Sequence, residues 1–266
     1  MNESNFQKMF LKIIGPLLVY YLVNLLCRKG IDLLLIAQGF PEGMDALNAG
    51  SASCINGICM TAGGLALIPC IRADRLFSRT GSGSVLNGIG SFLLALLTGA
   101  SMAIFFNMLI LYSGISRFSR EYAHAVRSLY AVDIAAGVVL YALVAPIVEE
   151  ILFRGILYGR LKSYAADGKA AIVASALLFG LYHGNLVQGI YGFLIGGLFA
   201  LLYEWSGSLW IPMVLHGAAN LCIYLLNTIA PKSLYGAVFS LSGTIFSFIL
   251  LGVCLLFWHR IKKSSH

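Results

Sequence analysis

The stretch Ala145–Arg154, APIVEEILFR, places two adjacent glutamates and an arginine inside a long apolar segment. In a lipid bilayer, about 20 predominantly apolar residues form a helix that satisfies its own backbone hydrogen bonds. An ionisable side chain in the middle of such a helix costs at least about 2.5–3.5 kcal/mol and usually marks a functional position. The segment therefore predicts a membrane helix that carries a polar site.

The rest of the chain has the composition of a membrane protein. Of its 266 residues, 59% are hydrophobic and 11% are charged, whereas a soluble domain has about 25% charged residues. The mean hydropathy is +0.86. The net charge of +7 comes from basic residues that lie between apolar runs rather than in one patch. This dispersion argues against nucleic-acid binding, which needs a basic patch.

The apolar runs predict an all-α, polytopic membrane helix bundle with about eight transmembrane helices. The expected helices cover residues 9–27, 51–70, 86–113, 131–161, 170–185, 187–204, 209–227 and 236–258. The segment 31–50 begins apolar but reaches Phe40-Pro41-Glu42-Gly43, and we expect it to lie at the membrane interface. The glutamate doublet then lies on the fourth helix, and two further polar motifs, around His183 and His216, lie on the fifth and seventh.

We expect one membrane domain in three parts: N-terminal helices and loops in 1–129, a catalytic helical core in 130–227, and the last helix with a basic tail in 228–266. With a cytoplasmic N-terminus, eight helices place twelve of the 18 lysines and arginines inside, which agrees with the positive-inside rule. Both termini are then cytoplasmic. The weakest point of this topology is the outer loop 115–130, which carries three arginines.

The glutamate doublet divides into two predicted roles. Glu150 and Arg154 are four residues apart, so they can form a buried ion pair on one helix face. This pairing accounts for Glu150 and leaves Glu149 without a partner. Intramembrane carboxylates are functional candidates by default, and Glu149 is therefore the predicted reactive group.

Two of the five histidines lie in, or at the end of, apolar helices. They belong to the motifs Phe179-x-x-x-His183 and His216-x-x-x-Asn220, whose spacing puts both members on one helix face. At about 1.5 Å per residue from the inner helix ends, both histidines can reach the layer of the glutamates. The predicted site consists of Glu149, Glu150, Arg154, His183, His216 and Asn220.

These residue types indicate hydrolysis. The chain contains neither the H-E-x-x-H of a zinc-protease helix nor the G-x-S-x-G of a serine hydrolase. A carboxylate and a histidine can activate water instead, while a second histidine and an asparagine can hydrogen-bond an oxyanion. Alternatively, Glu149, His183 and His216 could bind Zn²⁺, which takes such nitrogen and oxygen ligands. The sequence leaves both mechanisms open.

The three motifs, in this order, resemble those of the CPBP family, which comprises CAAX proteases and bacteriocin-processing enzymes, also called Abi proteins. The connection Leu202–Pro212, LYEWSGSLWIP, is also similar to that of the family, and the resemblance covers about residues 130–225. It implies an intramembrane endopeptidase, for which both metal-dependent and metal-free glutamate mechanisms are proposed. The implied roles are water activation by Glu149 and His183, support of the site by Glu150 and Arg154, and oxyanion binding by His216 and Asn220.

The resemblance implies that the substrate is a membrane-associated protein or peptide, of the CAAX type or of a peptide-maturation type. The modest size and the lack of an organelle-targeting segment indicate a bacterial plasma membrane protein. Two alternatives are an immunity or scaffolding protein that binds a peptide or sensor kinase in the same cavity, and a transporter that uses Glu149 and Glu150 as a proton relay. No inverted repeat with paired broken helices supports the transporter.

Overall fold

The computed structural model describes residues 3–77, 89–164 and 167–264, and within these ranges every regular element is helical. The α-helices are α1 Glu3–Ala37, α2 Ala49–Leu65, α3 Ile68–Ala73, α4 Ile89–Ser113, α5 Arg120–Tyr130, α6 Ile134–Val138, α7 Ala145–Glu150, α8 Gly159–Tyr164, α9 Gly168–Tyr182, α10 Leu186–Ser206, α11 Trp210–Thr228, α12 Lys232–Val238 and α13 Leu241–Ser264. Two short 3₁₀ helices, Gly43–Ala46 and Ile115–Phe118, precede α2 and α5. The predicted all-α class is confirmed.

Six helices in the described part of the chain are long and apolar enough to cross a membrane. They are Met9–Ala37, Ile89–Ser113, Ile134–Tyr164, Leu186–Ser206, Trp210–Thr228 and Leu241–Lys262. The chain is therefore a polytopic membrane protein, with six candidate spans rather than the expected eight. The other two expected spans correspond to α2 and α9, which have 17 and 15 residues and are shorter than the roughly 20 residues of a full crossing.

Two expected boundaries in the first part of the chain are wrong. Helix α1 continues past residue 27 to Ala37, so most of the apolar part of segment 31–50 is helix rather than an interfacial stretch. The charged residues do not end the helix, because arginine and lysine are good helix formers. Arg28 lies at the helix surface and donates a hydrogen bond to Asn56 Oδ1 at 3.3 Å. The expected second helix is divided into α2 and α3, because Pro69 occupies the first turn of α3 and cannot continue a preceding helix.

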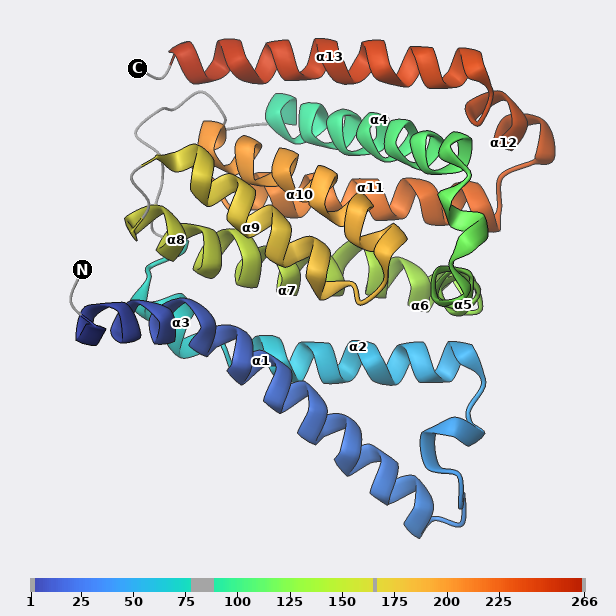
Figure 1. Cartoon of the computed structure of the whole chain (residues 1–266). Coiled ribbons are helices and arrows are strands. Elements are labelled where there is room, and N and C mark those ends of the chain that lie inside the picture. The colour runs from blue at the N-terminus through green and yellow to red at the C-terminus, as the bar shows by residue number, and fades with distance from the viewer. Residues whose placement is uncertain (1–2, 78–88, 165–166, 265–266) are drawn as a thin grey trace.

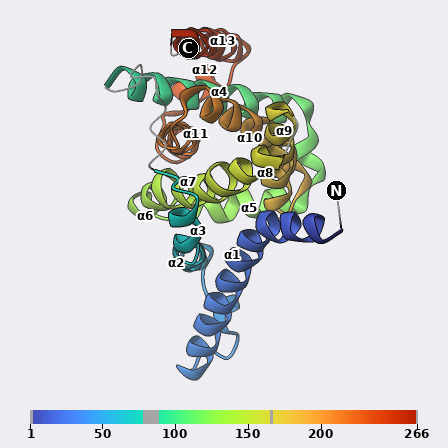
Figure 2. The same ribbon diagram turned by 90° about the vertical axis from the view of Figure 1, so that its left-hand side faces the viewer.

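The long helices run roughly parallel, and α13 forms the edge of the bundle opposite α1 and α2 (Figure 1). Helix α4 packs against α11 and α13, and α9 packs along α10. Helices α4 and α11 approach closely at Gly99, where a Cβ atom would collide with the backbone oxygen of Leu215. The C-terminal half of α1 extends beyond the rest of the bundle (Figure 2), and its contact with the other helices includes the bond from Arg28 to Asn56 of α2.

The helix that carries the glutamates changes its hydrogen-bonding pattern twice. Residues Ile134–Tyr164 form one long span, within which α7 lies between two π-helical segments, Val139–Val144 and Ile151–Tyr158. Pro146 stands in the first turn of α7 and cannot donate to the preceding turn. Such π segments are frequently found at functional sites, and here they flank the segment that ends with Glu149 and Glu150.

Candidate active site

The predicted ion pair between Glu150 and Arg154 forms inside the protein. Arg154 Nη1 donates to Glu150 Oε1 at 2.9 Å, and neither side chain is exposed to solvent. A buried pair of this kind needs further hydrogen bonds to offset its desolvation. Arg154 Nη2 supplies one by donating to the backbone oxygen of Gly196 at 2.9 Å.

Two aromatic rings complete the surroundings of Arg154. Its guanidinium lies 4.3 Å from the ring centroid of Phe179 and 5.2 Å from that of Phe199, distances that allow cation–π attraction. Phe179 belongs to α9 and Phe199 to α10. Arg154 therefore joins the glutamate helix to both neighbouring helices. Glu150 Oε2 and Arg154 Nε have no hydrogen-bond partner among the described residues.

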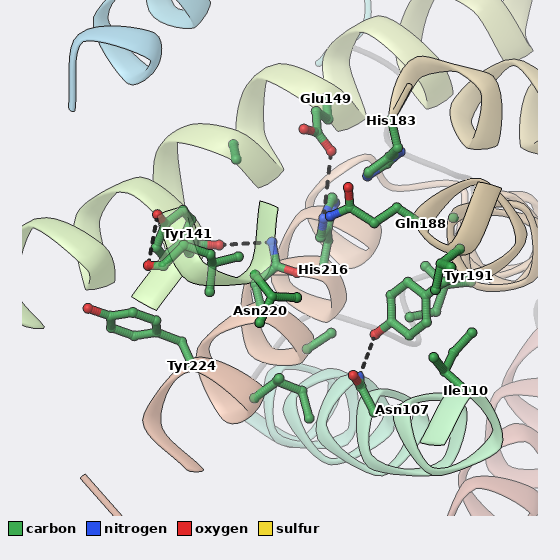
Figure 3. A pocket seen from close by; sticks show the side chains of 18 of the residues that line it. Asn107, Ile110, Tyr141, Glu149, His183, Gln188, Tyr191, His216, Asn220 and Tyr224 are labelled. Carbon is green, nitrogen blue, oxygen red and sulfur yellow. Dashed lines mark hydrogen bonds and ion pairs between the residues drawn. The ribbon is translucent and has the colours of Figure 1, made fainter. Parts of the chain in front are cut away.

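His216 lies against both glutamates. Its Nδ1 is 2.8 Å from Glu150 Oε1, and this carboxylate oxygen already accepts a hydrogen bond from Arg154. Because a carboxylate accepts, Nδ1 of His216 carries the proton and Nε2 is left without one in the neutral ring. Nε2 lies 3.7 Å from Glu149 Oε2 (Figure 3), too far for a direct hydrogen bond.

His183 caps the end of α9 rather than lying within the helix. Its Nδ1 lies 2.9 Å from the backbone oxygen of Phe179. A carbonyl oxygen only accepts, so Nδ1 is again the protonated nitrogen and Nε2 is the free acceptor. The Phe179 ring packs edge-on against both histidines, with centroid distances of 4.9 Å to His183 and 5.8 Å to His216. The i,i+4 spacing of this motif therefore orients His183 directly.

Asn220 lies one turn beyond His216 on α11. Its Nδ2 donates to the backbone oxygen of Tyr141 at 3.1 Å, in the π-helical segment before α7. An amide nitrogen carries two hydrogens, so this bond orients Asn220 and leaves it a second donor. The bond also ties α11 to the glutamate helix.

A cavity of about 300 Å³ contains four of the six predicted residues: Glu149, His183, His216 and Asn220 line it. Glu150 and Arg154 are not among its lining residues and support it from behind. Tyrosines cover much of the remaining wall, namely Tyr122, Tyr130, Tyr141, Tyr191 and Tyr224. Burial raises the pKa of Tyr122 and Tyr130 above the usual value, so both stay neutral at physiological pH. The cavity is thus a mainly apolar chamber with a carboxylate and two imidazoles at one place.

Two parts of the cavity wall, helix α5 and Gln188, were not predicted from the sequence. Residues 115–130 were expected to form an outer loop, but α5 covers the cavity with the side that carries Tyr122, Val126, Leu129 and Tyr130. The spacing of these residues is that of one helix face, which is a signal that the sequence contains. Gln188 also lines the cavity, and its signal was a polar residue near the start of an apolar helix.

The expected alternative of a zinc site, with Glu149, His183 and His216 as ligands, stays a prediction. Within the described ranges, no group of three or more histidine, cysteine, aspartate or glutamate residues is placed to hold a metal ion. Nδ1 of each histidine is already bonded to the protein. This leaves Nε2 of each ring available, either to a water molecule or to Zn²⁺.

Substitution of Gly196 by alanine is expected to displace Arg154. A Cβ atom at this position would lie 2.8 Å from Arg154 Nη2 and 2.8 Å from Phe179 Cδ1. Overpacking of this kind costs about 1–3 kcal/mol, against a gain of about 1 kcal/mol from replacing glycine in a helix. We expect Gly196→Ala to lower the free energy of unfolding and to impair any activity of the site.

The adjacent Gly197 provides a matched control for this substitution. A Cβ atom there meets only the Cβ of Ala176, at 3.9 Å, so Gly197→Ala should be neutral or slightly stabilising. Thermal unfolding of both variants in detergent measures the difference. Equal unfolding temperatures would show that Arg154 tolerates the added methyl group.

Comparisons with known proteins place this site in a recognised segment. Residues 131–222 match the model of the family described as type II CAAX prenyl endopeptidase Rce1-like. The chain is 28% identical over 114 residues to the putative membrane peptidase YdiL of Bacillus subtilis (strain 168), which is 43% of this chain and 46% of YdiL. It is 28% identical over 98 residues to the membrane-embedded CAAX protease MroQ of Staphylococcus aureus (strain USA300), which is 35% of this chain and 40% of MroQ. The match therefore spans less than half of either relative. No solved structure matches the chain.

Proposed function

Because the chain belongs to the Rce1-like type II CAAX prenyl endopeptidase (CPBP) family of membrane proteins, we propose that it is an intramembrane endopeptidase. Its substrate is a membrane-associated protein or peptide, and its chemistry resides in the segment 130–227. The observation that carries the proposal is the cavity in which Glu149 meets two histidines that both present an unprotonated Nε2.

Glu149 acts as the general base. Its carboxylate takes a proton from a water molecule that also hydrogen-bonds to Nε2 of His183, and the resulting hydroxide attacks the carbonyl carbon of the scissile peptide. Protonated Glu149 then delivers the proton to the departing nitrogen, and the C–N bond breaks. The products are a carboxylic acid and an amine, so the water is consumed and Glu149 is regenerated.

The remaining residues stabilise the charges of this reaction. The free N–H of Asn220 Nδ2 donates to the oxyanion, as does Nε2 of His216 when that ring is protonated. Glu150 accepts hydrogen bonds from both Arg154 and His216. It therefore fixes the ring orientation of His216 and balances its charge.

In the proposed topology, the short helices α2 and α9 also cross the membrane, and together with the six longer spans they make eight passes. An even number of passes agrees with the two chain ends, which lie toward the same end of the bundle (Figure 1). With twelve of 18 basic residues on that side, the positive-inside rule makes both termini cytoplasmic, in a bacterial plasma membrane.

The experiment that tests the function is cleavage of membrane-inserted peptides, including CAAX-terminated prenyl peptides and bacteriocin-type precursors, by the protein reconstituted in liposomes. Mass spectrometry of the products locates the cleaved bond. Cleavage by the wild-type protein that is lost in Glu149→Gln supports the proposal, whereas cleavage retained in this variant refutes it.

The metal-free mechanism makes a separate prediction. Purified, active protein should contain much less than one equivalent of zinc by elemental analysis, and a strong chelator should leave the cleavage rate unchanged. The physical reason is that the Glu149 carboxylate and Nε2 of His183 together suffice to polarise and deprotonate a water molecule. Stoichiometric zinc that is lost on Glu149→Ala would contradict this mechanism.

A further inference from the structure

Hydrolysis of a peptide requires N–H donors at the developing oxyanion, and the cavity has already used most of its donors. Nδ1–H of His216 bonds to Glu150, and Nδ1–H of His183 bonds to the Phe179 carbonyl. Asn220 gives one of its two N–H groups to the Tyr141 carbonyl. Asn107, at another wall, donates to the Ala103 carbonyl and contacts the Tyr191 hydroxyl. The neutral site therefore presents mainly acceptors.

Gln188, like Asn220, is a residue of this cavity with an unused N–H donor. It is the third residue of α10, and its side chain extends from that helix toward His216 (Figure 3). Asn185, the N-cap of α10, accepts from the Gln188 backbone N–H at 2.9 Å. In return, Asn185 Nδ2 donates to Gln188 Oε1. This two-way contact fixes which end of the Gln188 amide faces Asn185.

The consequence concerns the other end of that amide. With Oε1 bonded to Asn185, Nε2 and its two hydrogens are directed away from the cap. Within the part of the chain that the structure describes, no group accepts a hydrogen bond from Gln188 Nε2. A fixed, unused donor thus lies in the same cavity as Glu149, His183 and His216.

On the basis of the proposed function, we infer that Gln188 is a further catalytic residue, whose Nε2 donates a hydrogen bond to the carbonyl oxygen of the scissile peptide. The bond strengthens as this oxygen becomes an oxyanion, because charge-assisted hydrogen bonds are stronger than neutral ones. Gln188 supplies a second amide donor beside Asn220 that needs no protonation step, whereas His216 donates from Nε2 only as a cation.

A purely structural role for Gln188 is the competing explanation. A glutamine three residues after an asparagine N-cap is typical of a capping box, which stabilises the helix start. The two roles separate by substitution. Gln188→Glu retains a side chain that suits this position of a capping box but replaces the donor nitrogen by oxygen, and Gln188→Met retains the length without any donor.

The test measures kcat and KM separately in reconstituted protein. Removal of one oxyanion donor lowers kcat by about 10²–10³-fold, and we expect this loss in both Gln188→Met and Gln188→Glu, with KM changed by less than about threefold. The control Gln38→Met makes the same chemical change at an exposed position at the end of α1 and should leave kcat and KM unchanged. Thermal unfolding in detergent reports the structural contribution of each variant.

The outcomes are distinct. A kcat within about threefold of wild type in either Gln188 variant, or a rise in KM alone, overturns the inference. If Gln188→Met does not fold, Gln188→Glu decides the question. Activity retained in Gln188 variants but lost in Glu149→Gln refutes only the role of Gln188, whereas activity retained in Glu149→Gln refutes the proposed function itself.

Discussion

Glu149→Gln is expected to lower the cleavage rate by about 10²–10⁴-fold, the contribution of a positioned general base. The amide has the shape of the carboxylate but cannot take a proton from water. The side chain is only 10% exposed, so a base from bulk solvent cannot readily take the place of the carboxylate. The rate of product formation in liposomes, measured by mass spectrometry under single-turnover conditions, isolates the chemical step.

The protein should still fold when Glu149 is changed. Glu149 is not the partner of Arg154, and replacing it removes a buried charge rather than leaving one unpaired. Unfolding temperature and membrane yield should therefore match those of the wild type. Glu42→Gln, at an exposed glutamate, is the control and should cleave normally. A biological phenotype that survives Glu149→Gln would instead favour the immunity or scaffolding function.

Arg154→Met is expected to be the most destabilising single substitution of the site, by about 3–5 kcal/mol. It leaves Glu150 as a charge with no exposure and removes the hydrogen bond to the Gly196 carbonyl. It also removes the cation that lies over Phe179 and Phe199. Denaturant-induced unfolding in mixed micelles gives the free energy difference.

Two comparisons test the physical reason for this loss. The double variant Glu150→Gln/Arg154→Met removes both charges and should be more stable than Arg154→Met alone, since no buried ion remains unpaired. Arg72→Met, at an exposed arginine in α3, should change stability by less than about 0.5 kcal/mol. If the double variant is the less stable one, the unpaired charge is not the cause of the loss.

The helical class and the ion pair could be predicted because both depend on neighbours in the chain. Apolar runs become helices in lipid wherever they occur, since the backbone must satisfy its own hydrogen bonds. The Glu150–Arg154 pair follows from the i,i+4 geometry of one helix. Helix ends were harder to predict: α1 continues through Arg28 to Ala37, because arginine and lysine are good helix formers and do not terminate a helix.

The sequence by itself therefore determined the membrane environment, the helical class and which polar residues are costly enough to need a purpose. Only the tertiary structure decided how they meet: His216 contacts Glu150 across 66 positions of sequence, and α5 closes a cavity whose other walls come from distant segments of the chain. The physical reason is that hydrogen bonds between helices depend on their packing and rotation, which the π segments around α7 alter. The unused donor of Gln188 belongs to this second class, because its significance depends on which other donors the fold has already used.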